Sequence, residues 1–249
     1  MNPPLDTPAI AFDHVSYRVN GRALVDDLTL SVGQGETLVL LGRSGSGKTT
    51  SLKLINRLLE PTTGQVAVQG RLTTAWDPIR LRRGIGYVMQ DGGLFPHYTV
   101  ERNIALVPQI EGWPAGKSRA RVEELLALVG LGQELLGRYP RQLSGGQRQR
   151  VGVARALAVD PPILLLDEPF GALDPITRSD LQKEFRALQR KLKKTAIFIT
   201  HDLREALLLA DRVALMEGGR LVANLPVAEF SRSPDPLVRA YVEAFRDPQ

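Results

Sequence analysis

The sequence has no cysteine and only 3 histidines among its 249 residues. The absence of cysteine excludes disulfide bonds and thiolate metal sites, and so few histidines argue against a histidine-based zinc site. No apolar run approaches the roughly 20 residues that a membrane-spanning helix needs. Residues 1–6 lack the basic and apolar stretches of a signal peptide. We therefore expect a cytoplasmic protein.

The composition, 43% hydrophobic and 24% charged, is that of a globular protein with a large core. The formal net charge of +5 could suggest nucleic acid as a partner. However, the densest basic run, residues 190–194, ends a helical pattern, where cations interact favourably with the helix dipole. We interpret this run as a solvated helix end and predict no nucleic-acid partner.

The chain is organised around residues 42–49, GRSGSGKT, which fit the phosphate-loop pattern G-x-x-x-x-G-K-[ST]. A buried-strand pattern precedes the loop at residues 37–41, and helical spacing follows it at residues 50–58. We expect Lys48 to reach the β- and γ-phosphates of a nucleotide and the Thr49 hydroxyl to ligate Mg²⁺. The predicted phosphate-binding residues are Gly42, Arg43, Ser44, Gly45, Ser46, Gly47, Lys48, Thr49 and Thr50.

Polar side chains stand at the ends of three further predicted strands. Asp167 is expected to help hold Mg²⁺, and Glu168 to polarise the attacking water. The carboxamide of Gln90 can touch Mg²⁺ or that water. The imidazole of His201 can hydrogen-bond the γ-phosphate, because ligands bind at strand ends in open α/β sheets.

A second phosphate-binding device is predicted at residues 143–147, LSGGQ, before another helical pattern. Ser144 is expected to cap the helix, while Gly145 and Gly146, followed by Gln147, leave its start bare for an anion. A single nucleotide does not need two such devices. We infer a dimer in which this helix end meets the γ-phosphate bound to the second copy.

The strand and helix patterns predict an α/β fold. Residues 9–41 alternate like an antiparallel β layer, and from residue 163 onward strands alternate with helices, which implies a parallel sheet. We expect one domain over residues 1–249. Its predicted parts are a core at residues 1–90 and 157–230, a helical subdomain at residues 91–156 and a short tail at residues 231–249.

Within the insertion, we expect a helix from Thr99 through Leu106 and a loop at residues 112–116. A later helix is expected from Ser179. The loop after Gln90 should gain freedom from two glycines, and its Phe95 is apolar where a solvated loop should be polar. Phe95 either packs inside its own subdomain or belongs to a surface for a partner.

The order of these motifs resembles the nucleotide-binding subunit of ABC transporters over roughly residues 9–230. The resemblance implies a phosphate-loop NTPase core with an inserted helical subdomain, ATP and Mg²⁺ as cofactors, ATP hydrolysis, and a homodimer around two ATP molecules. It also implies that Asp174 couples the two sites and that the loop of Phe95 receives a short helix of a permease. The family's adenine-stacking aromatic residue would fall at Val19. Either Tyr17, two residues earlier on the strand, takes that role or adenine is held weakly.

Within this family, residues 55–62, 93–108 and 169–178 are similar to importers of glycine betaine, carnitine and choline. The likeness implies separate integral membrane permease subunits and an extracytoplasmic substrate-binding protein. It implies a peripheral location on the cytoplasmic face of the inner (plasma) membrane. Members of this group often add two C-terminal regulatory domains, which we do not expect here because the sequence ends at Gln249.

Three alternatives share part of this pattern. A non-transport ABC ATPase of DNA repair would add coiled-coil arms, yet no sustained heptads lie between Thr49 and Leu143, and translation types carry two ATP sites. A small-molecule phosphoryl transferase would share the phosphate loop but would not need residues 143–147. A third alternative keeps transport but changes the cargo to amino acids or lipids.

Overall fold

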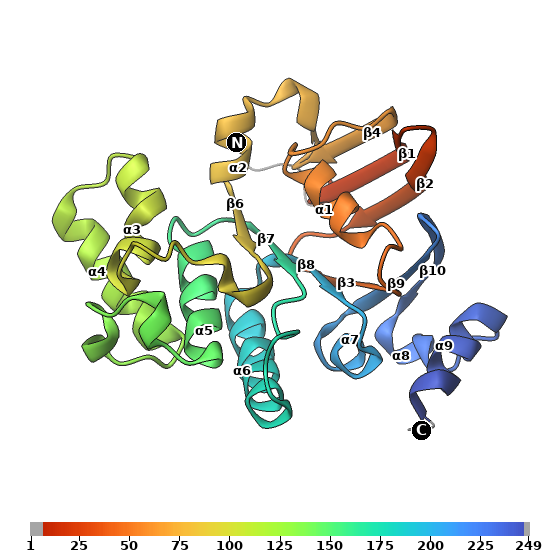
Figure 1. Ribbon diagram of the computed structural model, residues 1–249. Helices are drawn as coiled ribbons and strands as arrows, with labels where there is room; N and C mark the ends of the chain where they lie inside the picture. Colours follow the sequence, from red (N-terminus) through yellow and green to blue (C-terminus); the bar gives the residue numbers. More distant parts are fainter. Residues whose placement is uncertain (1–6, 247–249) are drawn as a thin grey trace. The chain divides into compact units, whose positions relative to one another are not determined.

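The computed structural model describes residues 7–246 and divides the chain into two compact units (Figure 1). Unit 1 combines Met1–Arg82 with Lys193–Gln249, and unit 2 is Arg83–Leu192. The predictions for residues 1–6 and for the last three residues of the tail lie outside the described residues. The partition into a core and a helical subdomain at residues 91–156 stays a prediction.

Unit 1 contains the predicted antiparallel β layer. The turn between its first two strands is Asn20-Gly21, as predicted, and both residues have positive φ angles, 50° and 78°. A two-residue hairpin turn needs such angles because its twist must match that of the strands. The sheet order is β2 (Arg22–Val32), β1 (Ile10–Val19), β4 (Thr63–Val68) and β5 (Arg71–Leu72).

The second group of strands in unit 1 is built around β3 (Thr37–Leu41), which runs parallel to β8 (Thr195–Thr200) and to β9 (Arg212–Glu217). Every residue of β3 and β8 is buried, which explains their continuous apolar sequences. β10 (Arg220–Pro226) pairs antiparallel with β9. The sequence did not predict β10, because its residues are mostly half-buried and show no clear alternation.

The first helix of unit 1 differs from its predicted length. α1 begins at the end of the phosphate loop and stops earlier than the predicted residue 58, because Arg57 adopts a left-handed φ of 53°. The bounds are α1 (Lys48–Ile55), α7 (Leu203–Leu209), α8 (Val227–Phe230) and α9 (Pro236–Arg246), with a 3₁₀ turn at Thr73–Ala75. α2 (Pro78–Arg83) lies at the boundary between the units.

Unit 2 places two parallel strands beside a group of helices. β6 (Ile85–Val88) pairs with β7 (Ile163–Asp167), so that Val88 lies opposite Leu166. The helices bury apolar residues such as Ile104, Leu125 and Val151 against one another. Their bounds are α3 (Val100–Ile110), α4 (Ala115–Leu128), α5 (Gly145–Ala156) and α6 (Pro175–Leu192), with 3₁₀ turns at Gln90–Gly93, Gln133–Leu135 and Pro140–Gln142.

Three predicted boundaries in unit 2 are wrong. α3 continues past Leu106 to Ile110, because its buried face includes Pro108. α4 begins at Ala115, inside the predicted loop, since Pro114 serves as its N-cap. α6 begins at Pro175 rather than at residue 179, and proline is favoured in the first turn of a helix. Within residues 7–246, none of the helices combines the length and apolarity that crossing a membrane requires.

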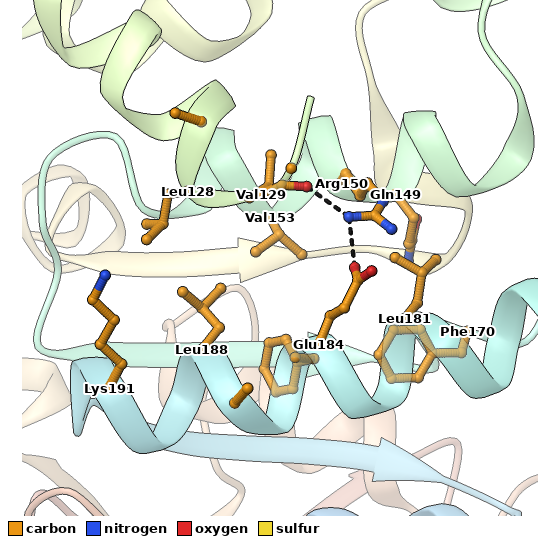
Figure 2. A pocket seen from close by; sticks show the side chains of 14 residues that line it. Leu128, Val129, Gln149, Arg150, Val153, Phe170, Leu181, Glu184, Leu188 and Lys191 are labelled. Carbon is orange, nitrogen blue, oxygen red and sulfur yellow. Dashed lines mark hydrogen bonds and ion pairs between the residues drawn. The ribbon is translucent and has the colours of Figure 1, made fainter. Parts of the chain in front are cut away.

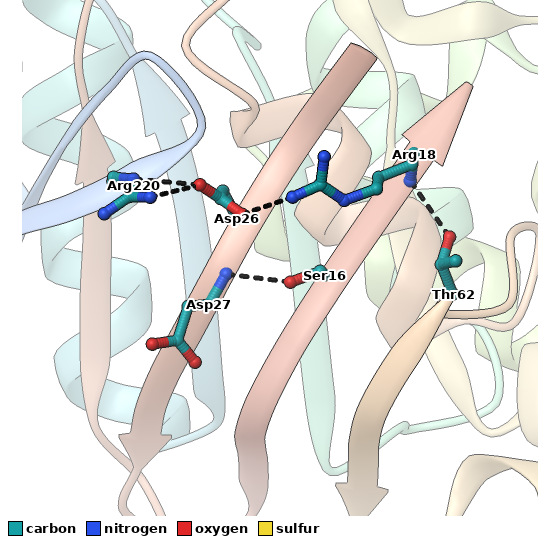
Figure 3. A network of polar contacts seen from close by, with 6 residues as sticks. All are labelled: Ser16, Arg18, Asp26, Asp27, Thr62 and Arg220. Carbon is teal, nitrogen blue, oxygen red and sulfur yellow. Dashed lines mark hydrogen bonds and ion pairs between the residues drawn. The ribbon is translucent and has the colours of Figure 1, made fainter. Parts of the chain in front are cut away.

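A polar network in unit 1 connects the β layer to the β9–β10 turn (Figure 3). Asp26 on β2 binds Arg18 on β1 at 3.1 Å and Arg220 on β10 at 2.5 Å. The backbone N–H of Asp26 donates to the carbonyl oxygen of Gly219 at 2.9 Å. The N–H of Gly219 in turn donates to the carbonyl oxygen of Ser46 at 3.2 Å. The turn is therefore fixed between the β layer and the phosphate loop.

Candidate nucleotide-binding site

The phosphate loop leaves β3 and enters α1 through a backbone that only glycine can follow. Gly42, Gly45 and Gly47 have φ angles of 154°, 79° and 99°. A Cβ on Gly42 would lie 2.3 Å from the carbonyl oxygen of Met216, and one on Gly47 would lie 2.5 Å from that of Leu24. β9 and β2 therefore press the loop into its shape, and both glycines are required by this close approach.

Lys48 lies inside the curve of this loop and is only 4% exposed. Its ammonium group donates to the carbonyl oxygens of Gly42 at 2.7 Å and Arg43 at 2.9 Å, and to the hydroxyl of Ser46 at 3.4 Å. The N-cap of α1 is Gly47, which has no side chain to cover the first backbone N–H groups. A positive charge and uncapped donors thus converge where an anion would be stabilised.

The structure brings His201 to the same sheet edge as the phosphate loop. Leu41, the last residue of β3, lies opposite Thr200, the last residue of β8. The phosphate loop and His201 therefore directly follow the ends of two neighbouring strands, β3 and β8, as predicted for a ligand site. Arg43, Ser44, Gly45 and His201 are exposed, whereas Thr49 and Thr50 are half-buried in the first turn of α1.

Tyr17 and Val19, the two candidates for the adenine contact, lie near the end of β1. Tyr17 is half-buried opposite Val25, and Val19 is 41% exposed. A register shift separates Tyr17 from Arg18, so the simple alternation of faces does not carry across this point. The assignment of Tyr17 to adenine stays a prediction.

In unit 2, Asp167 ends β7 beside a tyrosine that the sequence did not single out. The hydroxyl of Tyr87 on β6 donates to Asp167 Oδ2 at 3.3 Å. Burial, followed by the charge and hydrogen bond of Asp167, raises the pKa of Tyr87 well above its usual range. Tyr87 is thus a permanent donor that orients the carboxylate. Only the register of β6 and β7 reveals this pair, since the residues are 80 positions apart.

Gln90 and Glu168 meet around Gly171. A Cβ on Gly171 would lie 3.6 Å from Gln90 Nε2 and 3.7 Å from Glu168 Oε2, so both side chains face the same glycine. The N–H of Gly171 donates to the carbonyl oxygen of Glu168 at 3.1 Å. Glu168 has a φ of 43°, a left-handed conformation that is costly for a residue with a side chain and is concentrated at functional sites.

Ser144 caps α5, as predicted. Its hydroxyl accepts from the N–H of Gln147 at 3.2 Å, and the side chain of Gln147 accepts from the N–H of Ser144 at 2.9 Å. The glycines that follow have a packing reason that the sequence analysis missed. A Cβ on Gly146 would lie 2.8 Å from the methyl group of Thr177, and one on Gly145 would lie 3.2 Å from Leu173.

Asp174 stands before α6 and caps it. Its carboxylate accepts from the N–H of Thr177 at 3.0 Å, and hydrogen bonds from Thr177 hold the pKa of this exposed carboxyl below its usual value. The residue is therefore an acidic helix cap within reach of solvent.

The loop after Gln90 is closely packed, and its predicted freedom stays a prediction. Arg155 donates to the carbonyl oxygens of Gly93 at 2.8 Å and Gly92 at 3.0 Å, and its burial lowers its pKa. A Cβ on Gly92 would lie 2.7 Å from a carbonyl oxygen of α5, so this glycine permits the close packing of the loop against α5. Asn103, fully buried, fixes the backbone of Phe95, and the side chain of Phe95 remains 41% exposed.

A pocket of about 380 Å³ lies between the end of α4, α5 and α6 (Figure 2). Arg150 on α5 donates to the carbonyl oxygen of Val129 at 2.7 Å and pairs with Glu184 on α6 at 2.5 Å. Apolar side chains, among them Val153 and Leu188, line the remainder. The ion pair therefore connects α5, the helix capped by Ser144, to α6.

Comparison with known proteins gives a consistent answer. A family model described as ABC transporter matches residues 25–171. The chain is 50% identical over 225 residues to the glycine betaine/carnitine/choline transport ATP-binding protein OpuCA of Bacillus subtilis. The matched region covers 90% of this chain and 58% of OpuCA. It is 48% identical over 233 residues to the glycine betaine uptake system ATP-binding protein YehX of Escherichia coli. This match covers 93% of this chain and 76% of YehX.

Solved structures agree. The ATP-binding cassette MJ0796, solved as a dimer bound to ADP and Pi, matches with a TM-score of 0.78 at 31% identity and covers 88% of this chain and 98% of that one. The cbiO1 protein of Clostridium perfringens, part of the ABC transporter complex cbiONQ, matches with a TM-score of 0.84 at 26% identity and 97% coverage of both chains. These matches confirm the predicted α/β phosphate-loop fold. The chain belongs to the ABC transporter family, and its relatives confirm the predicted likeness to the glycine betaine, carnitine and choline group.

Proposed function

We propose that this chain is the ATP-hydrolysing subunit of an importer. Two copies close around two ATP molecules and drive a separate integral membrane permease, which imports osmoprotectants of the glycine betaine or choline type. The observation that carries this proposal is the 50% identity, over 90% of the chain, to an ATP-binding protein of glycine betaine, carnitine and choline transport. Because the chain spans only 58% of that relative, its partners and cargo are part of the proposal.

In this proposal the phosphates of ATP bind residues 42–50. The ammonium of Lys48 exchanges its contacts with the loop carbonyls for the β- and γ-phosphates, and the uncapped start of α1 supplies backbone donors. Tyr17 contacts adenine. The imidazole of His201, which follows the strand beside the loop, hydrogen-bonds the γ-phosphate.

We further propose Mg²⁺ as cofactor, with oxygen donors from the Thr49 hydroxyl, the Gln90 carboxamide and the Asp167 carboxylate. This donor set contains a single carboxylate, which fits Mg²⁺, because Mg²⁺ is usually held by one or two carboxylates together with substrate phosphates rather than by an all-protein cage. Bound Mg²⁺ would neutralise charge on the phosphate oxygens. Glu168 would then accept a proton from the attacking water, while Gln90 orients it.

We propose the dimer because the start of α5 would give each copy a second anion site. Ser144, Gly145, Gly146 and Gln147 begin α5, and we propose that they contact the γ-phosphate held by the other copy, with Asp174 coupling the two sites. A structural relative, MJ0796, was solved as a dimer bound to ADP and Pi, which supports the proposal of a dimer.

The cargo is the least constrained part of the proposal, because the cargo is expected to contact the permease and an extracytoplasmic substrate-binding protein rather than this chain. The sulfate/thiosulfate import ATP-binding protein CysA of Xanthomonas campestris is 46% identical over 240 residues. Sulfate is therefore a second candidate cargo. In either case we propose a peripheral location on the cytoplasmic face of the plasma membrane.

Co-purification of the tagged chain with its permease, followed by reconstitution into liposomes together with the extracytoplasmic substrate-binding protein on the opposite side of the membrane, tests the function. Uptake of labelled glycine betaine, choline and sulfate would be measured with and without Mg-ATP on the side of this chain. We expect ATP-dependent uptake of glycine betaine or choline and none of sulfate. Uptake of sulfate alone would reassign the cargo. A chain that neither releases phosphate from ATP nor retains a permease would contradict the function itself.

A further inference from the structure

The C-terminal helix α9 is firmly anchored within unit 1 (Figure 1). The carboxylate of Asp235 accepts from the N–H groups of Leu237 at 2.8 Å and Val238 at 3.2 Å, which fixes the start of the helix. Val238 is fully buried and Val242 is 6% exposed, so one face of α9 packs into the unit. Residues between these two are therefore held in a defined position.

Tyr241 lies on this helix, and its hydroxyl donates to the backbone carbonyl oxygen of His201 at 3.0 Å. Its ring stacks on Phe245, with centroids 5.3 Å apart. The pKa of Tyr241 is raised to about 12, mainly because the hydroxyl is buried. The charge of Arg43 opposes this rise, and the charge of Asp202 adds to it. The hydroxyl is hence a donor at every physiological pH.

The segment that Tyr241 touches is very short. β8 ends at Thr200 and α7 begins at Leu203, so only His201 and Asp202 connect them. The N–H of Asp202 donates to the hydroxyl of Thr200 at 2.9 Å, and its carboxylate accepts from the N–H of Arg204 at 2.7 Å. Asp202 is thus fixed on both sides, and the bond from Tyr241 fixes the remaining peptide group, that of His201.

We propose that Tyr241 is a positioning residue for ATP hydrolysis, because its hydroxyl holds the peptide of His201 and thereby aims the imidazole. This inference rests on the proposed function, in which His201 contacts the γ-phosphate. A group that must stabilise charge in a transition state works best when its direction is set beforehand. α9 thereby connects the C-terminal part of unit 1 to the reacting end of the nucleotide.

Steady-state hydrolysis by Tyr241→Phe tests the proposal, because this change removes only the hydroxyl and keeps the ring. We expect kcat to fall about three- to tenfold, as for the loss of one hydrogen bond, while KM for ATP changes less than twofold. Phe245→Leu is the matched control: it removes the ring stacking but keeps the hydroxyl, and its kcat should stay within twofold of wild type. Thermal unfolding checks that each variant is folded.

A double variant separates positioning from general support of the fold. In single-turnover reactions with excess protein, adding Tyr241→Phe to His201→Ala should cause no further loss beyond twofold, since the side chain to be aimed is gone. A further three- to tenfold loss would overturn the proposal, as would Tyr241→Phe with wild-type kcat in a protein that loses activity on His201→Ala. A wild-type chain without ATPase activity would instead contradict the proposed function.

Discussion

Replacing Lys48 by alanine removes the charge at the centre of the phosphate loop. The side chain is 4% exposed, and its ammonium lies 2.7 and 2.9 Å from two loop carbonyl oxygens, so it is already held where phosphate oxygens would replace them. Loss of one preorganised donor to a developing charge costs about 3 kcal/mol, which corresponds to a roughly 150-fold slower reaction. The loop also loses the internal hydrogen bonds of Lys48. This loss should lower the free energy of unfolding by about 1 kcal/mol and the melting temperature by about 2–4 °C.

Phosphate release from Mg-ATP measures the first effect, and thermal unfolding without nucleotide measures the second. Lys53→Ala is the matched control, because Lys53 is an exposed lysine on the same helix. It should keep wild-type activity and stability. A folded Lys48→Ala protein that releases phosphate within tenfold of the wild-type rate would refute the role assigned to this residue.

Three further predictions test other parts of the proposal. An equal mixture of inactive Ser144→Arg and inactive Lys48→Ala proteins should regain about a quarter of wild-type phosphate release, since half the dimers keep one intact composite site; a silent mixture contradicts independent composite sites. Phe95→Ala should leave the ATPase rate within twofold but uncouple transport in the assembled complex, and coupled uptake at the wild-type rate would exclude Phe95 from the permease interface. Tyr87→Phe should raise the Mg²⁺ concentration for half-maximal hydrolysis about tenfold by freeing Asp167, and an unchanged Mg²⁺ dependence would argue against this orientation.

The sequence predicted features whose cause is local. The phosphate loop, the Asn20-Gly21 turn and the Ser144 cap each depend on neighbouring residues with fixed spacing. β3 and β8 were predictable because complete burial leaves a continuous apolar run. The same local reasoning predicted the order of the strands and helices around the candidate site.

Features that depend on contacts between distant residues were not predictable. Tyr241 binds a backbone carbonyl 40 residues away, which leaves no trace in residue type. Gly92 resembles a flexible glycine until the structure shows α5 pressing on it. Likewise β10, an edge strand with mostly half-buried residues, lacks the alternation that would have marked it.

The central claim, that two copies close around ATP and then hydrolyse it, is tested most directly by Glu168→Gln. Glutamine has nearly the same shape as glutamate but cannot accept a proton from water, so ATP should bind and persist. Size-exclusion chromatography with light scattering would be run with Mg-ATP and with Mg-ADP, alongside phosphate release. We predict a dimer with ATP, a monomer with ADP, and almost no hydrolysis. A variant that turns over ATP at the wild-type rate, or stays monomeric in its presence, would contradict the account.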